Sequence, residues 1–188
     1  MAATPLHPRF MRPRLTESLA DTPVVLVHGP RQCGKMTLAR QVGDAKGYAY
    51  VSFDDDVLRA SVQADAAGFV ADLPDKVVLD EVQRVPALFM SIKAAVDRDR
   101  RPGRFILTGS ANVLLVPRLA DSLAGRLEIL RLHPLAHKRP GFLDSLFDAG
   151  FKASTRPRLG RALAERVAAG GYPAALARPV ARRRTAWY

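Results

Sequence analysis

The chain has 188 residues, of which 48% are hydrophobic, and it carries a formal net charge of +11. This length and apolar content predict one globular domain of typical size with a small appendage. A single cysteine excludes an internal disulfide and indicates a reducing, cytoplasmic compartment. No apolar run approaches the roughly 18 residues of a membrane span, so we expect no membrane partner.

The positive charge is concentrated in the last third of the chain. Residues 131–188 carry 12 basic and three acidic residues, which is +9 of the +11. Two interpretations stay open for this segment. It can form a solvated basic helical surface, or it can contact nucleic acid or another polyanion.

In chain order, residues 1–22 form a basic N-terminal segment with a short helix from Pro13 to about Ala20. A β-branched apolar strand begins at Val24 and runs into a glycine loop and a helix. The stretch fits the phosphate-binding P-loop pattern G-x-x-x-x-G-K-[ST] at every fixed position but the last. The residues expected to bind nucleotide are Gly29, Pro30, Arg31, Gln32, Cys33, Gly34, Lys35, Met36 and Thr37.

Each fixed residue of the loop has a physical role. We expect Gly29 to let the chain turn sharply off the strand and Gly34 to let the backbone approach a phosphate. The N–H groups of the loop and of the first helical turn point at an anion. Lys35 brings a positive charge to the β- and γ-phosphates of the nucleotide.

The residue after the lysine departs from the motif. A Ser or Thr hydroxyl there binds Mg²⁺, whereas Met36 offers a soft thioether that a hard cation does not accept. Thr37 is rotated by about 100° around the helix from that position. The sequence therefore predicts nucleotide hydrolysis that is impaired at the metal.

Strands and helices alternate through residues 23–133, which we expect to form the ATPase core. Short apolar strands, rather than alternating ones, favour a parallel sheet that is covered by helices on both faces, an α/β fold. We expect residues 134–188 to form a helical, lid-like segment. Further strands are expected at 48–53, 77–79, 105–107 and 127–132. Residues 57–73 are expected to form one helix, or two with the break at Gly68. Other helices are expected at 86–99, 112–124, 141–149, 158–169 and 173–186, the last with a break at Pro179.

Three further sites carry candidate chemistry. Val77–Leu79 ends in Asp80-Glu81, as the second half of a P-loop site (Walker B) does, so Asp80 is the candidate Mg²⁺ residue and Glu81 the candidate for polarising the attacking water. The alternative is a strand that ends in an acidic turn. The carboxyl ends of parallel strands are where ligands bind in such sheets.

The fourth strand ends in T-G-S-A-N, where Ser110 or Asn112 can contact the γ-phosphate or orient the water. The alternative is a helix N-cap. Arg126, between a helix and the fifth strand, is a candidate arginine finger, in cis or across a subunit boundary of a homo-oligomer. The alternative is a surface arginine at a helix end. Cys33 is either a thiolate favoured by Lys35 and the helix N-terminus, or a small filler residue.

The motifs G-P-R-Q-C-G-K, F-D-D-D, V-V-L-D-E-V-Q-R-V-P, F-I-L-T-G-S-A-N and S-L-A-G-R-L-E-I-L-R-L-H-P-L occur in this order. Together they resemble the bacterial and archaeal AAA+-type ATPases whose P-loop reads GPRQxGKTT. The resemblance covers about residues 9–188. It implies a three-layer fold with strand order 5-1-4-3-2. It also implies ATP and Mg²⁺ as ligands, with a Thr at the position of Met36.

The same resemblance implies a longer protein. Family members are roughly twice as long and continue past the region like 170–173 into a second domain of uncertain function, so we expect this chain to be truncated. Two other hypotheses stand beside the ATPase. One is a nucleic-acid-binding module that uses the basic C-terminal third, and the other is a remnant without function.

Overall fold

The computed structural model describes residues 9–110, 123–135, 160–178 and 180–188. By its internal contacts the chain divides into two compact units, Leu6–His133 and a second unit that contains Pro134–Tyr188. Among the described residues, no helix has the length and apolarity to cross a membrane.

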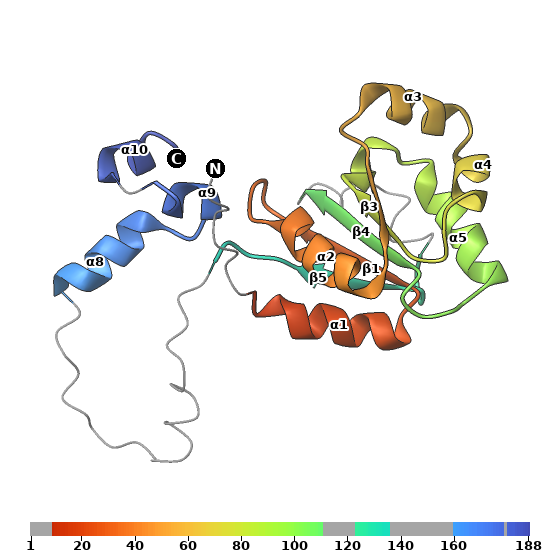
Figure 1. The fold of residues 1–188 in the computed structure, drawn as a ribbon, viewed down its shortest axis with the longest axis horizontal. Helices are drawn as coiled ribbons and strands as arrows, with labels where there is room; N and C mark the ends of the chain where they lie inside the picture. Colours follow the sequence, from red (N-terminus) through yellow and green to blue (C-terminus); the bar gives the residue numbers. More distant parts are fainter. Residues whose placement is uncertain (1–8, 111–122, 136–159, 179) are drawn as a thin grey trace, which may run out of the picture. The chain divides into compact units, whose positions relative to one another are not determined.

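The first unit is built on a five-stranded parallel sheet (Figure 1). Its strand order is β2-β3-β4-β1-β5, which is 5-1-4-3-2 when it is counted from the β5 edge, as expected. The three inner strands are almost wholly buried, whereas the edge strands β2 and β5 are partly exposed. The strands are β1 (Val24–Gly29), β2 (Ala49–Ser52), β3 (Val77–Asp80), β4 (Phe105–Ser110) and β5 (Leu127–Arg131).

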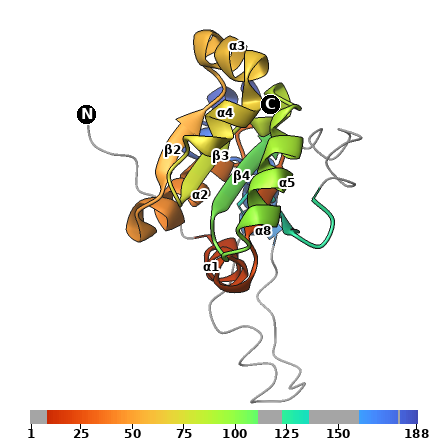
Figure 2. The ribbon, with the colours of Figure 1, turned by 90° about the vertical axis from the view of Figure 1, so that its right-hand side faces the viewer.

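Helices cover both faces of this sheet. The helices α1 (Met11–Asp21) and α2 (Lys35–Gly43) pack on one face, and α5 (Leu88–Arg98) packs on the other (Figure 2). Alternation along the strands sends Leu26 and Leu107 into one apolar cluster with the buried residues of α5. Fully burying such a side chain stabilises the fold by about 2 kcal/mol.

The remaining elements connect these layers. After α2 comes η1 (Asp44–Lys46), and between β2 and β3 lie α3 (Asp56–Ala64) and α4 (Ala66–Ala71). The expected break at Gly68 is wrong, because Asp65 separates the two helices and its carboxylate caps the second by accepting a hydrogen bond from Gly68 N. The short η2 (Val82–Arg84) precedes α5.

The second unit is helical in its described part. It contains α8 (Gly160–Ala169), α9 (Pro173–Leu176) and α10 (Ala181–Thr185). The expected helix at 141–149, most of that at 112–124 and the break at Pro179 lie outside the described residues. Three aromatic rings of this unit contact one another in tilted and edge-to-face arrangements, with centroids 5.2–6.0 Å apart: Tyr172, Trp187 and Tyr188.

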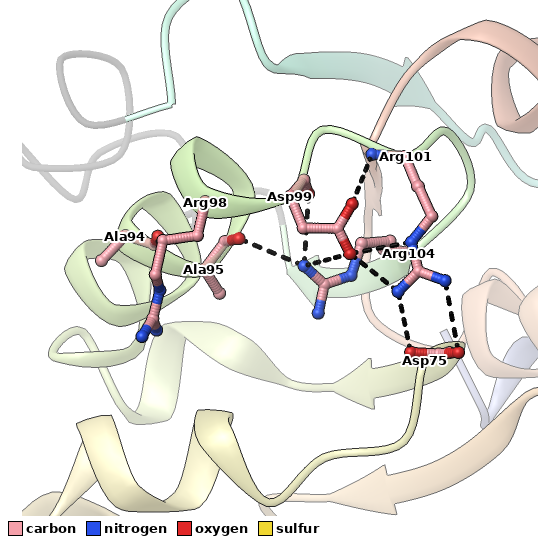
Figure 3. Close-up of polar contacts among 7 residues, drawn as sticks. All are labelled: Asp75, Ala94, Ala95, Arg98, Asp99, Arg101 and Arg104. Atoms are coloured by element: carbon pink, nitrogen blue, oxygen red, sulfur yellow. Dashed lines mark hydrogen bonds and ion pairs between the residues drawn. The ribbon is translucent and has the colours of Figure 1, made fainter.

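Ion pairs gather at the amino ends of the strands. Arg101, in the turn before β4, donates to Asp99 and to Asp75, which precedes β3 (Figure 3). Arg104 donates to the carbonyl oxygens of Ala95 and Asp99, and so ties the end of α5 to the start of β4. Hydrogen bonding to Arg101 lowers the pKa of both carboxyl groups. This end of the sheet is therefore held by charges that neutralise one another.

Candidate functional site

The phosphate loop lies at the carboxyl end of β1, one of the three inner strands of the sheet. The strand ends at Gly29, and α2 begins at Lys35. The Lys35 side chain is only 5% exposed, and its ammonium donates to the carbonyl oxygens of Gly29 (3.2 Å) and Pro30 (3.0 Å). An ammonium held by neutral carbonyl groups can exchange them for the stronger acceptor oxygens of a phosphate.

The two glycines of the loop are needed for different reasons. Gly34 has φ +94°, a left-handed conformation that favours glycine, and it caps the N-terminus of α2. Gly29 is needed for space rather than for the sharp turn that the sequence suggested, because a Cβ there would lie 2.1 Å from the carbonyl oxygen of Leu132. The end of β5 therefore lies directly against the start of the loop.

The other loop residues surround this turn. Arg31 and Gln32 are exposed, and Gln32 adopts a left-handed φ of +60°. Cys33 is fully buried, and its thiol donates to the carbonyl oxygen of Leu132 at 3.6 Å. Burial raises the pKa of this thiol, although Lys35 and other nearby groups act in the opposite direction. The filler interpretation of Cys33 fits this environment, and the thiolate interpretation does not.

Sequence reasoning missed Arg9, which contacts the loop from outside the motif. Its guanidinium donates to the carbonyl oxygen of Cys33 at 2.6 Å, and the same Nη2 atom lies 2.1 Å from the position of a Cβ on Gly34. The contact spans 24 residues of sequence, so no local pattern points to it. It adds a positive charge beside the loop and fixes the segment before α1 to it.

Asp80 lies at the end of β3, which β4 separates from β1 and its phosphate loop. The residue is only 5% exposed, and both carboxylate oxygens accept hydrogen bonds from hydroxyl groups. Tyr50, on β2, donates to Oδ2 at 2.8 Å, and Thr108, on β4, donates to Oδ1. Sequence analysis singled out neither hydroxyl, although Thr108 stands in the expected T-G-S segment. Burial and the bond to Asp80 raise the pKa of Tyr50.

Glu81 follows Asp80 in a left-handed conformation with φ +58°. Its amide N–H donates to the hydroxyl oxygen of Thr108 at 3.3 Å, and its carboxylate accepts a hydrogen bond from Gln83. A non-glycine residue in this region of φ is uncommon and places the side chain away from the direction of the strand. Thr108 thus joins the backbone of Glu81 to the carboxylate of Asp80.

Ser110 is brought to the site and Asn112 is not described. Ser110, the last residue of β4, pairs in register with Gly29, the first residue of the P-loop motif. Asn112 lies outside the described residues. The role of either side chain toward a γ-phosphate stays a prediction.

Arg126 lies at the opposite end of the sheet from the phosphate loop. Its backbone oxygen accepts a hydrogen bond from Val24 N at the start of β1, and its Nε donates to Asp97 at 2.5 Å. Val24 and Gly29 are the first and last residues of the six-residue strand β1, about 17 Å apart at 3.3 Å per residue. The placement does not support a finger in cis, and the role across a subunit boundary stays a prediction.

The site fits phosphate better than it fits Mg²⁺. The loop supplies a buried ammonium and a helix N-terminus, which suit an anion. At the metal position Met36 is 46% exposed and offers no oxygen, and Asp80 already accepts two hydrogen bonds. Within the described ranges, no group of three or more His, Cys, Asp or Glu can hold a metal ion. The part of the site that would bind Mg²⁺ therefore lacks the oxygen ligand that a Ser or Thr at position 36 would supply.

Comparison with known proteins places this site in a family. The family model described as AAA domain (AAA_14) matches residues 21–139, which include β1, the phosphate loop, Asp80 and β4. The chain belongs to this AAA domain family. A P-loop α/β core is therefore its fold, and the phosphate loop is the part that binds nucleotide in such a core.

Two mycobacterial proteins and one solved structure are similar to this chain. The uncharacterized proteins Mb2031c of Mycobacterium bovis and Rv2008c of Mycobacterium tuberculosis are each 40% identical over 129 residues, which is 68% of this chain and 29% of theirs. The chain thus spans less than a third of these relatives. The AMPPCP-bound DnaA of Aquifex aeolicus is 17% identical, with a TM-score of 0.51, over 80% of this chain and 55% of that one. This likeness supports the fold alone.

Proposed function

We propose that this chain is an ATP-binding AAA+-type domain in which the phosphate loop holds the triphosphate and hydrolysis is slow. The observation that carries the proposal is the buried ammonium of Lys35, whose hydrogen-bond partners among the described residues are the carbonyl oxygens of Gly29 and Pro30. Membership of the AAA domain family and the resemblance noted in the sequence favour ATP as the nucleotide.

Slow hydrolysis follows from the residues around the reacting phosphate. Glu81 is the candidate to polarise water, and Ser110 lies in register with the loop. When bound, Mg²⁺ would neutralise charge on the phosphates, with Asp80 as its protein partner. Met36 removes the hydroxyl that normally completes this arrangement, so we expect replacement by threonine to raise turnover.

Equilibrium binding of a fluorescent ATP analogue tests the proposal. Lys35→Ala should weaken binding by at least about a hundredfold, because the charge-assisted contacts to the phosphates are lost. Lys46→Ala is the matched control, since Lys46 is exposed and lies in η1 after the same helix. Circular dichroism of both variants separates loss of binding from loss of fold. Unchanged affinity in Lys35→Ala contradicts the proposal.

A second candidate function is binding of nucleic acid by the helical unit. Four side chains of this unit, with Ala186, line a hollow of about 400 Å³: Arg178, Arg182, Arg183 and Trp187. The guanidinium of Arg178 lies 5.9 Å from the centroid of the Trp187 ring, which Tyr172 and Tyr188 also contact. Cationic groups around an aromatic platform suit the phosphates and bases of a single strand.

Salt-dependent binding of a labelled oligonucleotide separates this second function from the first. Phosphate contacts predict a steep fall in affinity as the salt concentration rises. The double variant Arg182→Ala, Arg183→Ala should weaken oligonucleotide binding, and Lys35→Ala should leave it unchanged. Equal binding by the double variant and the wild type contradicts the second function without affecting the first.

A further inference from the structure

Asp80 is satisfied by two hydroxyl groups that come from the strands on either side of it. Tyr50 is on β2 and Thr108 is on β4, and each donates to a different oxygen of the carboxylate. Thr108 is fully buried, and Asp80 is nearly so. Solvent therefore has little access to this carboxylate, and its hydrogen-bond donors are groups of the protein.

The register of the sheet holds the three side chains together. Ser52 pairs with Asp80 and Leu79 pairs with Leu107, so alternate residues put Tyr50, Asp80 and Thr108 on the sheet face that α2 covers. The Tyr50 ring is also fixed from outside, because the guanidinium of Arg40, on α2, lies 4.8 Å from its centroid. The strand register and the contact with α2 therefore hold the two hydroxyl donors in place.

This arrangement changes what the carboxylate can do for a metal. Each Asp80 oxygen already accepts a hydrogen bond from a neutral donor, so about half of the acceptor positions of this carboxylate are taken before a hydrated cation binds. At the position of the motif where a hydroxyl binds Mg²⁺, Met36 contributes a thioether in place of an oxygen. Two independent features thus weaken the metal half of the site, while the ammonium of Lys35 leaves the phosphate half intact.

We propose that this chain holds nucleotide phosphates with little dependence on Mg²⁺, and that Tyr50 is the positioning residue that keeps Asp80 bound to hydroxyl donors. The inference rests on the proposed nucleotide binding and deepens it. Tyr50 acts through Asp80, to which its hydroxyl donates.

The first test measures affinity for the fluorescent ATP analogue in Mg²⁺ and in EDTA, with the full 188-residue chain. We expect the two dissociation constants to agree within about twofold, because a stronger metal contribution would need the missing ligand. Binding that weakens about tenfold or more in EDTA overturns the inference and leaves the proposed function standing. Absence of binding in both buffers overturns the proposed function, and the inference with it.

The second test isolates the tyrosine. In the Met36→Thr background Mg²⁺ should strengthen binding severalfold, and adding Tyr50→Phe should increase that ratio by about tenfold, the value of one hydrogen bond to a charged group. Tyr48→Phe is the matched control, because its hydroxyl donates to the Gly103 carbonyl at the other end of the sheet. If the two tyrosines had only a structural role, both substitutions would change the ratio of affinities with and without Mg²⁺ by the same factor. Equal ratios in the two variants therefore overturn the assignment of Tyr50.

Discussion

The charged groups of the phosphate site and those at the amino end of the sheet are satisfied in opposite ways. At the amino end Arg101 and Arg126 pair with aspartates, so positive and negative charges neutralise one another. At the carboxyl end the ammonium of Lys35 binds carbonyl groups, the carboxylate of Asp80 binds hydroxyl groups, and Arg9 binds a carbonyl group. Charges that bind only neutral groups keep their capacity to bind a charged ligand, which paired charges have lost.

The largest effect is expected from adding a methyl group where the backbone is crowded. In Gly29→Ala the Cβ would lie 2.1 Å from the Leu132 carbonyl oxygen, and in Gly103→Ala it would lie 2.7 Å from that of Leu19. Each should lower the free energy of unfolding by about 3 kcal/mol, as measured by urea denaturation. Only Gly29→Ala should also weaken nucleotide binding. An equal loss of affinity in both variants would contradict the distinction between the two ends.

A smaller loss of stability is expected from Thr108→Val, which keeps the shape of a fully buried side chain and removes its hydroxyl. Asp80 then loses a donor and the amide of Glu81 loses its acceptor. The free energy of unfolding should fall by about 2 kcal/mol. Arg101→Ala, at the amino end, is the comparison and should cost much less, because its side chain is 57% exposed.

The two ends should also respond to acid in different ranges. His28, at the end of β1, has its pKa lowered by burial and then by Arg131, so its proton binds more weakly in the folded chain. The unfolded chain takes up that proton first, and stability should fall as the pH drops below the ordinary value of 6.5. Replacing His28 with asparagine should remove this loss in denaturation curves at pH 8 and pH 5.

The aspartates at the amino end of the sheet should also make the chain less stable as the pH falls, but in a lower pH range. Ion pairing with arginine lowers the pKa of Asp75, Asp97 and Asp99 from the ordinary value of 3.8. Their contribution to stability is complete above that value and is lost as the pH falls below it. Denaturation midpoints between pH 5 and pH 2 measure this loss. If His28→Asn shifts this lower range as well, the two ends are coupled.

The smallest effect is expected from Asp97→Asn, which breaks the ion pair with Arg126. Exposed pairs contribute little, so the melting temperature should barely change. Nucleotide affinity should not change either, because the pair lies at the amino end of the sheet. A clear loss of ATP turnover that depends on protein concentration would instead support the prediction that Arg126 acts across a subunit boundary.

The sequence predicted the fold and the phosphate loop well because both depend on local patterns. Apolar runs mark the strands, and the spacing of Gly29, Gly34 and Lys35 marks the loop. The partners of Asp80 were not predicted, because Tyr50 and Thr108 lie 30 and 28 residues away and only the strand register brings them together. The sequence placed Arg126 directly before the fifth strand, as the structure has it, but its partners Val24 and Asp97 were not predicted, because they are far away in the sequence.

The buried thiol of Cys33 makes the phosphate loop observable without a label. It is the one cysteine in the chain, and it is closed off against the Leu132 carbonyl inside the loop. An alkylating reagent can reach it only while the loop is open, so the rate of alkylation reports how often opening occurs. Mass spectrometry of the intact protein, with and without ATP, would measure this alkylation rate and so show whether nucleotide changes how often the loop opens.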